Sequence, residues 1–251
     1  MRLTVLGGCG AWPAAGLACS GYLVEHDGFR LLIDPGYATL PRLLTVADAT
    51  EVDAVLVSHG HPDHCADLNP LLRARVLRDD PAPALPVFAP AGALGPVLAL
   101  DRPGMLDDAI ALREFTPGDR LTVGPFGVRS WLLPHFMPNA GLRLEADGRS
   151  LAYTGDTGPS PLLAELAVGA DVYLAEATYP WQVPPDSERY LSSGRLAGAV
   201  AREAGVGRLL LTHLQPGADP DEAVRAAAES YPGEIAVASA GLVTQADPRG
   251  E

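Results

Sequence analysis

Apolar residues follow two periods along the chain, and each period predicts a different kind of element. Short runs rich in Val, Leu and Ile predict strands, whereas apolar residues three or four positions apart predict helices. The predicted strands cover residues 3–6, 22–25, 30–33, 52–57, 86–88, 121–123, 128–133, 142–145, 150–153, 171–175, 208–211 and 235–238. The predicted helices cover residues 40–46, 62–77, 95–100, 161–168, 192–204 and 220–231. Residues 101–108 lack a period and predict a loop or lid, and we expect residues 247–251 to fray.

Clusters of strands punctuated by helices occur in both halves of the chain. This order predicts an α/β (α+β) fold in which two mixed β-sheets lie face to face and outer helices cover them, a four-layer αββα sandwich. No stretch has the composition of a linker, so we expect one domain over residues 1–251. Asp27-Gly28 and Asp147-Gly148 predict tight hairpin turns, and His26 beside the first is expected to be an exposed turn residue.

Composition narrows the possible classes of function. Hydrophobic residues make up 47% of the chain and charged residues 20%, which suits a globular protein with a large core. The net charge of −13 argues against a nucleic-acid partner. All 18 basic residues are arginine, which excludes lysine nucleophiles and hints at a GC-rich bacterial genome. Without a signal-peptide or membrane-span pattern, we expect a cytoplasmic protein with no membrane partner.

The stretch His59-Gly60-His61-Pro62-Asp63-His64 carries the strongest chemical signal. It places three imidazoles and a carboxylate within six residues, directly after the predicted strand 52–57. A loop at the end of a strand can direct several side chains to one point. Imidazole nitrogens and carboxylate oxygens are ligands for Zn²⁺ and related metals. The stretch therefore predicts a metal site, with a polar surface turn as the alternative.

Further ligand-type residues stand at the ends of other predicted strands. His135 follows 128–133, Asp156 follows 150–153 and His213 follows 208–211. With the signature H-x-H-x-D-H at residues 59–64, this ordered set resembles the metallo-β-lactamase fold superfamily, whose fold is the αββα sandwich. The resemblance runs from the first strand to about residue 240.

The resemblance implies two metal ions side by side. It assigns His59, His61 and His135 to the first ion, and Asp63, His64 and His213 to the second, with Asp156 bridging them. Zn²⁺ is the expected metal, although Mn²⁺ and Fe suit the same ligands. Such a pair activates a water for hydrolysis, and Asp63 is a further candidate as proton acceptor. The resemblance thus implies a metallo-hydrolase.

The substrate class depends on a second set of residues. Ala175-Glu176-Ala177-Thr178 resembles the Glu-Ala-Thr element of the ribonuclease Z branch, where a downstream His couples to this Glu and helps to protonate the leaving group. In this chain Tyr190 stands at the matching position. This departure and the charge of −13 argue against tRNA 3′ processing. We expect a phosphodiesterase acting on a small phosphodiester such as a cyclic nucleotide, with Glu176 and Tyr190 as catalytic candidates. Glu176 as support for His213, and Tyr190 as a surface aromatic, are the alternatives.

Two other functions remain open. An acyl hydrolase, such as a lactonase, a thioesterase or a tailoring enzyme of secondary metabolism, would use the same metals with an apolar pocket. Phe136, Met137, Trp12 and Trp181 are candidates to line it, unless they belong to the core. The other alternative is a metal-binding scaffold without catalysis, against which the intact ligand set argues. We expect a small-molecule substrate, and a homodimer is possible.

Several residues near the motifs have two interpretations, a role at the metal site and an ordinary structural role. Asp34 either orients the histidine loop, as the resemblance implies, or caps the following turn. The Gly-rich loop 7–16, with Trp12, is either a simple turn or the mouth of the site. Cys65 is expected to be a small buried residue that supports the start of a helix, with thiolate ligation or redox sensing as the alternative. Cys9 and Cys19 are candidates to line the mouth.

Overall fold

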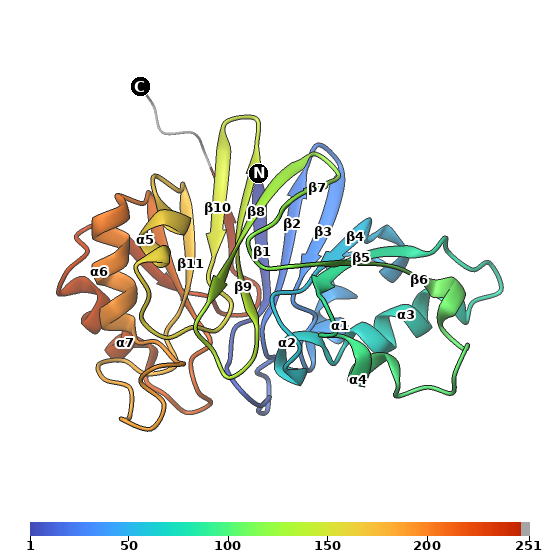
Figure 1. The fold of residues 1–251 in the computed structure, drawn as a ribbon, viewed down its shortest axis with the longest axis horizontal. Coiled ribbons are helices and arrows are strands. Elements are labelled where there is room, and N and C mark those ends of the chain that lie inside the picture. Colours follow the sequence, from blue (N-terminus) through green and yellow to red (C-terminus); the bar gives the residue numbers. More distant parts are fainter. Residues whose placement is uncertain (247–251) are drawn as a thin grey trace.

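Two seven-stranded β-sheets form the centre of the protein, seen in a computed structural model that describes residues 1–246 (Figure 1). The predicted fraying of residues 247–251 lies outside the described residues. In spatial order, the first sheet contains β14 (Val243–Gln245), β1 (Arg2–Gly7), β2 (Gly21–His26), β3 (Phe29–Ile33), β4 (Ala54–Leu56), β5 (Leu85–Pro90) and β6 (Ile110–Phe115). The second contains β13 (Glu234–Val237), β12 (Arg208–Thr212), β11 (Val172–Glu176), β10 (Arg149–Tyr153), β9 (Asn139–Ala146), β8 (Phe126–Leu133) and β7 (Arg120–Val123).

Both sheets are mixed in the same way. Strands β14 to β3 and β7 to β10 pair antiparallel, whereas β3 to β6 and β10 to β13 pair parallel. The carboxyl ends of parallel strands meet at one edge, so the loops that follow β4, β11 and β12 gather there. Tight turns occupy the opposite edge, where the β2–β3 and β9–β10 hairpins end at the top of Figure 1.

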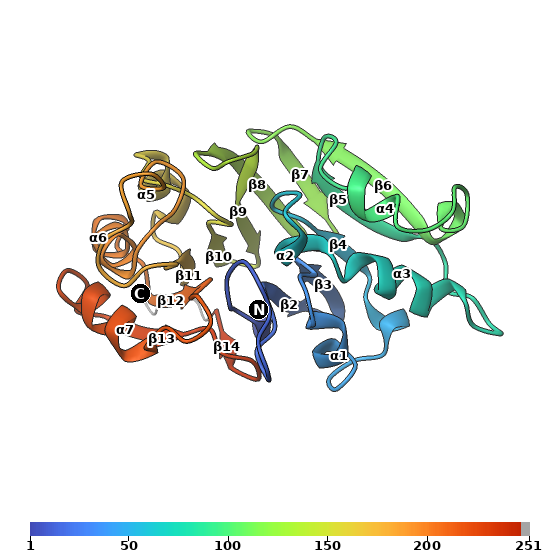
Figure 2. The same cartoon turned by 90° about the horizontal axis from the view of Figure 1, so that it is seen from below.

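Helices cover the outer face of each sheet (Figure 2). The first sheet carries α1 (Thr39–Leu43), α2 (Pro62–Cys65), α3 (Leu68–Val76) and α4 (Gly95–Leu98), and the second carries α5 (Leu162–Ala167), α6 (Gly194–Ala204) and α7 (Pro220–Ala228). Two short 3₁₀ helices, η1 (Ala49–Glu51) and η2 (Asp107–Ala109), complete the set of described helices.

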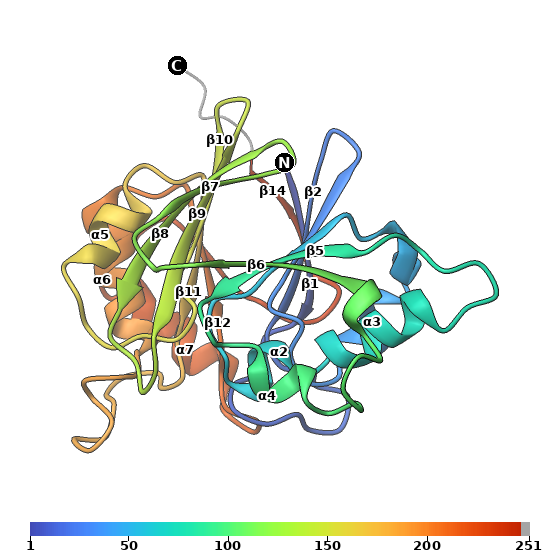
Figure 3. The ribbon, with the colours of Figure 1, turned by 45° about the vertical axis from the view of Figure 1, so that its right-hand side comes forward.

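Three apolar layers hold these elements together. One lies between the sheets, around Tyr22, Phe126 and Tyr153. A second packs α5 to α7 on the second sheet, and a third packs α1 to α4 on the first. Turning the molecule shows the sheets side by side between the two helical layers (Figure 3). The predicted αββα sandwich is therefore confirmed.

Several predicted elements differ from those observed. The single helix predicted over residues 62–77 is two helices, α2 and α3. Pro70 lacks the N–H that would bond the Ala66 carbonyl, and the Asp67 N–H instead bonds the Pro35 carbonyl at 2.8 Å. Strands β6 and β14 were not predicted, because β6 carries three exposed residues in a row and β14 has only three residues.

The prediction that His26 is an exposed turn residue is wrong. His26 is the last residue of β2 and is buried. Its ring centroid lies 6.0 Å from that of Phe126, and its Nε2 lies 2.9 Å from an oxygen of Asp147 in the opposite hairpin. The Asp27-Gly28 turn forms as predicted. Side chains of β2 alternate between its two faces, and His26 falls on the face that points inward rather than to water.

Candidate metal centre

The stretch after β4 directs two side chains, His59 and His61, to one point with two partners from the second sheet. His59 Nε2 and His135 Nε2 each lie 3.0 Å from His61 Nδ1, and Asp156 Oδ2 lies 3.8 and 3.7 Å from His59 and His135. Two ligands at the Zn–N distance of 2.0–2.1 Å, at a tetrahedral angle, are about 3.3 Å apart. These four donors are therefore spaced as ligands of one ion.

A second cluster shares Asp156. His213 Nε2 lies 3.1 Å from Asp63 Oδ2 and 3.2 Å from Asp156 Oδ2, while His64 Nε2 lies 3.2 Å from Asp156 Oδ1. The structure thus brings all seven predicted ligands together as two groups of four, with the Asp156 carboxylate in both. We call this end of the sandwich the metal edge.

Two buried atoms at the second cluster indicate that a cation fits there. His64 Nε2 and Asp156 Oδ1 lie 3.2 Å apart but neither has a partner in hydrogen-bond geometry, although His64 is completely buried and Asp156 is 3% exposed. Buried polar atoms are nearly always paired, so two orphaned atoms that face each other need a partner between or beside them. A divalent ion supplies that partner to both, and the His/Asp clusters are consistent with divalent metal ions.

Burial keeps the first cluster neutral. It lowers the pKa of His59 well below 6.5 and, less strongly, the pKa of His61 and of His135. A neutral imidazole is the form that ligates a metal. These three side chains therefore do not have to release a proton near neutral pH before they bind an ion.

Charges dominate the second cluster. Burial alone would lower the pKa of His64 and His213, but Asp156 raises that of His213 to about 9 and that of His64 well above 6.5. Burial would raise the pKa of Asp63 and Asp156, yet the facing histidines hold both well below 3.8. Without an ion the cluster is a set of ion pairs, in which a divalent cation would replace the imidazolium protons.

Asp34 anchors the histidine loop from behind, which supports the first of its two interpretations. Its carboxylate accepts hydrogen bonds from the Ser58 N–H at 2.7 Å, the Ser58 hydroxyl at 2.6 Å and the Tyr153 hydroxyl at 2.8 Å. His64 Nδ1 lies 2.8 Å from the same carboxylate. This contact orients the His64 ring so that Nε2 faces the centre.

Glu176 lies behind the second cluster rather than in it. Its carboxylate accepts hydrogen bonds from the Thr178 hydroxyl at 2.6 Å, the Ser192 N–H at 3.0 Å and the Thr157 N–H. Thr178 Oγ1 in turn lies 2.9 Å from His213 Nδ1. Burial, and then Asp156, raise the pKa of Glu176 to about 7. These contacts favour the interpretation that Glu176 positions His213 over the one in which it contacts a substrate directly.

Tyr190 lies beside the first cluster. His135 Nδ1 donates to the Tyr190 carbonyl at 2.9 Å, which leaves His135 Nε2 free to ligate. The Tyr190 side chain is half-buried and packs on Phe136, with ring centroids 4.7 Å apart. The backbone role was not predicted. A carbonyl that accepts from a residue 55 positions away leaves no mark in the sequence.

The loop after β1 forms part of the mouth, as one of its two interpretations proposed. The Ala11 N–H donates to Asp63 Oδ2 at 2.9 Å, and Gly10 lies so close to His213 that a Cβ there would come within 2.5 Å of Nδ1. Trp12 follows with half of its surface exposed. The contact of Ala11 was missed by sequence reasoning, because a backbone donor has no residue signature.

The three cysteines are buried. Cys65 is the last residue of α2, and its Sγ lies 3.3 Å from the carbonyl of His61, which precedes the helix, so Cys65 is a small buried residue that supports the helix start, as predicted. Cys9 lines a hollow with Leu214, next to His213. Cys19, near the end of the loop after β1, is completely buried and donates its N–H to the Tyr37 carbonyl at 2.9 Å, so it does not line the mouth, contrary to expectation.

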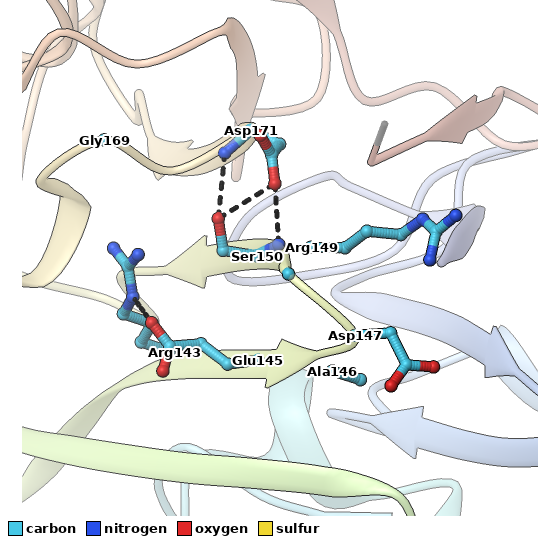
Figure 4. A pocket seen from close by; sticks show the side chains of 9 residues that line it. Arg143, Glu145, Ala146, Asp147, Arg149, Ser150, Gly169 and Asp171 are labelled. Carbon is cyan, nitrogen blue, oxygen red and sulfur yellow. Dashed lines mark hydrogen bonds and ion pairs between the residues drawn. The ribbon is translucent and has the colours of Figure 1, made fainter. Parts of the chain in front are cut away.

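A separate hollow of about 610 Å³ opens on the outer side of the β9–β10 hairpin (Figure 4). Several of its polar groups are already paired. Asp171 accepts from the Ser150 N–H at 2.7 Å, and Arg143 donates to Glu145 at 2.7 Å and to the Val168 carbonyl at 2.8 Å. It lies at the opposite end of β10 from Asp156. This hollow therefore takes no part in the metal centre.

No helix within residues 1–246 is both long and apolar enough to cross a membrane.

Comparison with known proteins gives a consistent family. Residues 29–214 match the model of the beta-lactamase superfamily domain. The chain is 30% identical over 246 residues to "Probable metallo-hydrolase YhfI" of Bacillus subtilis (strain 168), covering 97% of this chain and 99% of that protein. The crystal structure of YhfI superposes with a TM-score of 0.88 and covers the same shares of the two chains.

Two further proteins extend the comparison. Ribonuclease Z of Mycobacterium bovis (strain BCG / Pasteur 1173P2) is 32% identical over 267 residues, covering 94% of this chain and 95% of that protein. A diphosphatase of the PhnP family superposes with a TM-score of 0.75 at 19% identity, covering 98% of each chain, which shows a shared fold. The chain belongs to the metallo-β-lactamase superfamily, as a YhfI-like protein with the His/Asp metal site of a metallo-hydrolase.

Proposed function

We propose that this protein is a phosphodiesterase that hydrolyses a small phosphodiester, such as a cyclic nucleotide, at a pair of divalent metal ions. The observation that carries the proposal is the Asp156 carboxylate, which belongs to both clusters of donors. Zinc is the expected metal, since imidazole and carboxylate donors at tetrahedral spacing suit it. His59, His61 and His135 would hold one ion, and Asp63, His64 and His213 the other.

Two ions held here would lower the pKa of a water near neutrality and neutralise charge on a phosphoryl group during its displacement. The protein itself fixes the donors. Asp34 and Thr178 set the ring orientations of His64 and His213, and the Tyr190 carbonyl sets that of His135. Donors fixed in this way need little rearrangement when the substrate reacts.

The proton-transfer candidates differ in their environments. Asp63 has a strongly lowered pKa, and its Oδ2 is 3.1 Å from His213 Nε2, which favours a ligand over a general base. Glu176 is enclosed by its own hydrogen bonds, so we assign it a positioning role. Tyr190 is half-buried beside Phe136, which leaves it as the candidate donor to a leaving group.

A small substrate fits the charge of the chain better than tRNA does. The relative named ribonuclease Z shares 32% identity, but a net charge of −13 opposes binding along a phosphate backbone. The second candidate function is acyl hydrolysis at the same centre. Acyl hydrolysis is favoured by Phe136 and Leu132, which line the same hollow as His135. Their exposed apolar side chains would contact the acyl group of such a substrate.

The test is hydrolysis of bis(p-nitrophenyl) phosphate by zinc- or manganese-loaded protein, followed by cyclic nucleotides. We expect turnover that disappears with a chelator and in Asp156→Ala. Asp147→Ala is the matched control, because it removes a carboxylate that faces His26 at the other edge. Absence of turnover with two ions bound per chain would contradict the proposal and direct the search to lactones and thioesters.

A further inference from the structure

We infer that Phe136, with Tyr190 packed against it, is the platform on which the base of a nucleotide substrate stacks while its phosphate lies at the metal centre. The inference rests on the proposed phosphodiesterase function and names the part of the substrate that the protein recognises. It assigns a binding role to an aromatic pair next to, but outside, the donor set.

The position of Phe136 is the first support. Its ring centroid lies 5.3 Å from that of His135, with the two planes at 69°. It is nevertheless 56% exposed. Single exposed apolar side chains are common on protein surfaces and do not by themselves indicate a binding site. Phe136 differs because its exposed ring contacts a candidate metal ligand, so a substrate that reaches the centre can also contact the ring.

The second support is that backbone contacts fix the Tyr190 side of the pair. The Phe136 and Tyr190 centroids are 4.7 Å apart and the planes are inclined by 37°. The Tyr190 carbonyl accepts from His135, and its N–H donates to the Ser187 carbonyl at 2.9 Å. Gly158 lies against this segment so closely that any side chain there would collide with the Arg189 carbonyl. A platform fixed before binding loses little entropy when a ligand stacks on it.

Space for a base is the third support. A hollow of about 510 Å³ opens beside Phe136, lined by Leu132, Pro134, His135, Met137 and Ser160. Its volume falls in the range of small-molecule sites. His135 is one of its lining residues, so a ligand with its phosphate at the centre can extend into it.

The chemistry favours a flat heteroaromatic group as the occupant. Aromatic platforms stack any base, with a contribution of about 1–3 kcal/mol per base. Hydrogen bonds specific to one base are not needed for this contact. The expected substrates are therefore nucleotides as a class, with a preference for the larger purine surface.

The test measures the dissociation constants of adenosine 5′-monophosphate and ribose 5-phosphate on the metal-loaded protein, by isothermal titration calorimetry. The two ligands share the phosphate and differ in the base. We expect the wild type to prefer the nucleotide at least about fivefold, because stacking contributes about 1–3 kcal/mol. Phe136→Leu, which keeps an apolar side chain but removes the ring, should abolish most of this preference, and Phe136→Tyr should restore it.

Trp12→Leu is the matched control, because Trp12 is a similarly exposed aromatic in the loop that contacts Asp63 rather than His135. A preference that survives Phe136→Leu, or that is lost in Trp12→Leu instead, would overturn the inference. Equal binding of the two ligands by the wild type would also overturn it, while turnover of bis(p-nitrophenyl) phosphate would leave the proposed function standing. A nucleotide preference that depends on Phe136, without turnover of any phosphodiester, would contradict the function and leave the platform intact.

Discussion

The two ends of the sandwich use the same residue types for different purposes. At the metal edge, five histidines and two aspartates from both sheets converge, and both clusters include Asp156. At the other end, which we call the hairpin edge, His26 of the first sheet faces Asp147 of the second at 2.9 Å and Asp27 at 3.9 Å. Here too a histidine meets carboxylates across the gap between the sheets.

The two ends differ in how deeply their carboxylates are buried. Asp27 and Asp147 have side chains that are 75% and 69% exposed, whereas His59, His64 and Asp156 are buried. The hairpin aspartates are turn residues with φ of 47° and 48°, and their side chains point to water. A His/Asp cluster at a tight turn is therefore hydrated, while longer loops at strand ends can fold over their donors and exclude water.

The same hydrogen-bonding motif, an aspartate that accepts from both the N–H and the hydroxyl of one serine, occurs near both edges. Asp34 at the metal edge accepts from both the N–H and the hydroxyl of Ser58, and Asp171, near the hairpin edge, accepts from both groups of Ser150. Only Asp34 also contacts a ring of the metal centre. The same local motif thus orients a ligand in one place and only joins two strands in the other.

The largest expected effect comes from removing the shared carboxylate. Asp156→Ala should lower hydrolysis by on the order of 10³ or more, because neither cluster keeps its four donors. Metal content, measured by plasma mass spectrometry after dialysis, should fall with it. Asp147→Ala should retain both, and equal losses in the two variants would contradict the distinction between the edges.

Asp34→Asn should weaken metal binding by about 100-fold, since the amide cannot accept from all the groups that surround the carboxylate. Competition with a chromogenic chelator measures the affinity. Asp171→Asn breaks the equivalent bonds to Ser150 and is the control. If Asp171→Asn weakened metal binding as much, general loosening of the sheet would explain both variants.

Thr178→Val should weaken binding by about tenfold, because it removes the hydroxyl that links Glu176 to His213 without changing the shape of the side chain. The same competition assay applies. Thr178→Ser should restore the affinity. A variant Thr178→Val with unchanged affinity would show that His213 does not need this link.

The smallest effect is expected at the hairpin edge. Asp147→Asn should lower the free energy of unfolding by no more than about 1 kcal/mol, because an exposed partner contributes little and Asn tolerates the left-handed turn. Urea denaturation of the chelated protein measures this change. A larger loss would mean that the His26 contact between the sheets matters more than its exposed partner implies.

The sequence predicted the metal edge well for a physical reason. Each candidate ligand follows a buried strand, and parallel strands bring their carboxyl ends together, so His135, Asp156 and His213 were identified from local patterns. The spacing of apolar residues likewise predicted both sheets and most of the helices. It failed for β6, whose exposed residues hide the strand period, and for His26, whose burial depends on Phe126 and Asp147 about a hundred or more positions away.

The supporting contacts were much less visible in the sequence. Tyr153 reaches Asp34 across 119 positions, and the Ala11 N–H reaches Asp63 across 52. These contacts exist only after the sheets have packed face to face. Backbone groups such as the Tyr190 carbonyl carry no residue signature, so no sequence pattern could have assigned them.

The most direct test of the account is an anomalous X-ray diffraction experiment on crystals of the zinc-loaded protein, with data collected on both sides of the zinc absorption edge. We predict two zinc peaks per chain at the metal edge, one among His59, His61 and His135 and one among Asp63, His64 and His213, with Asp156 between them. We predict no peak beside His26 and Asp147. A single peak at the metal edge, or zinc at the hairpin edge instead, would contradict this prediction.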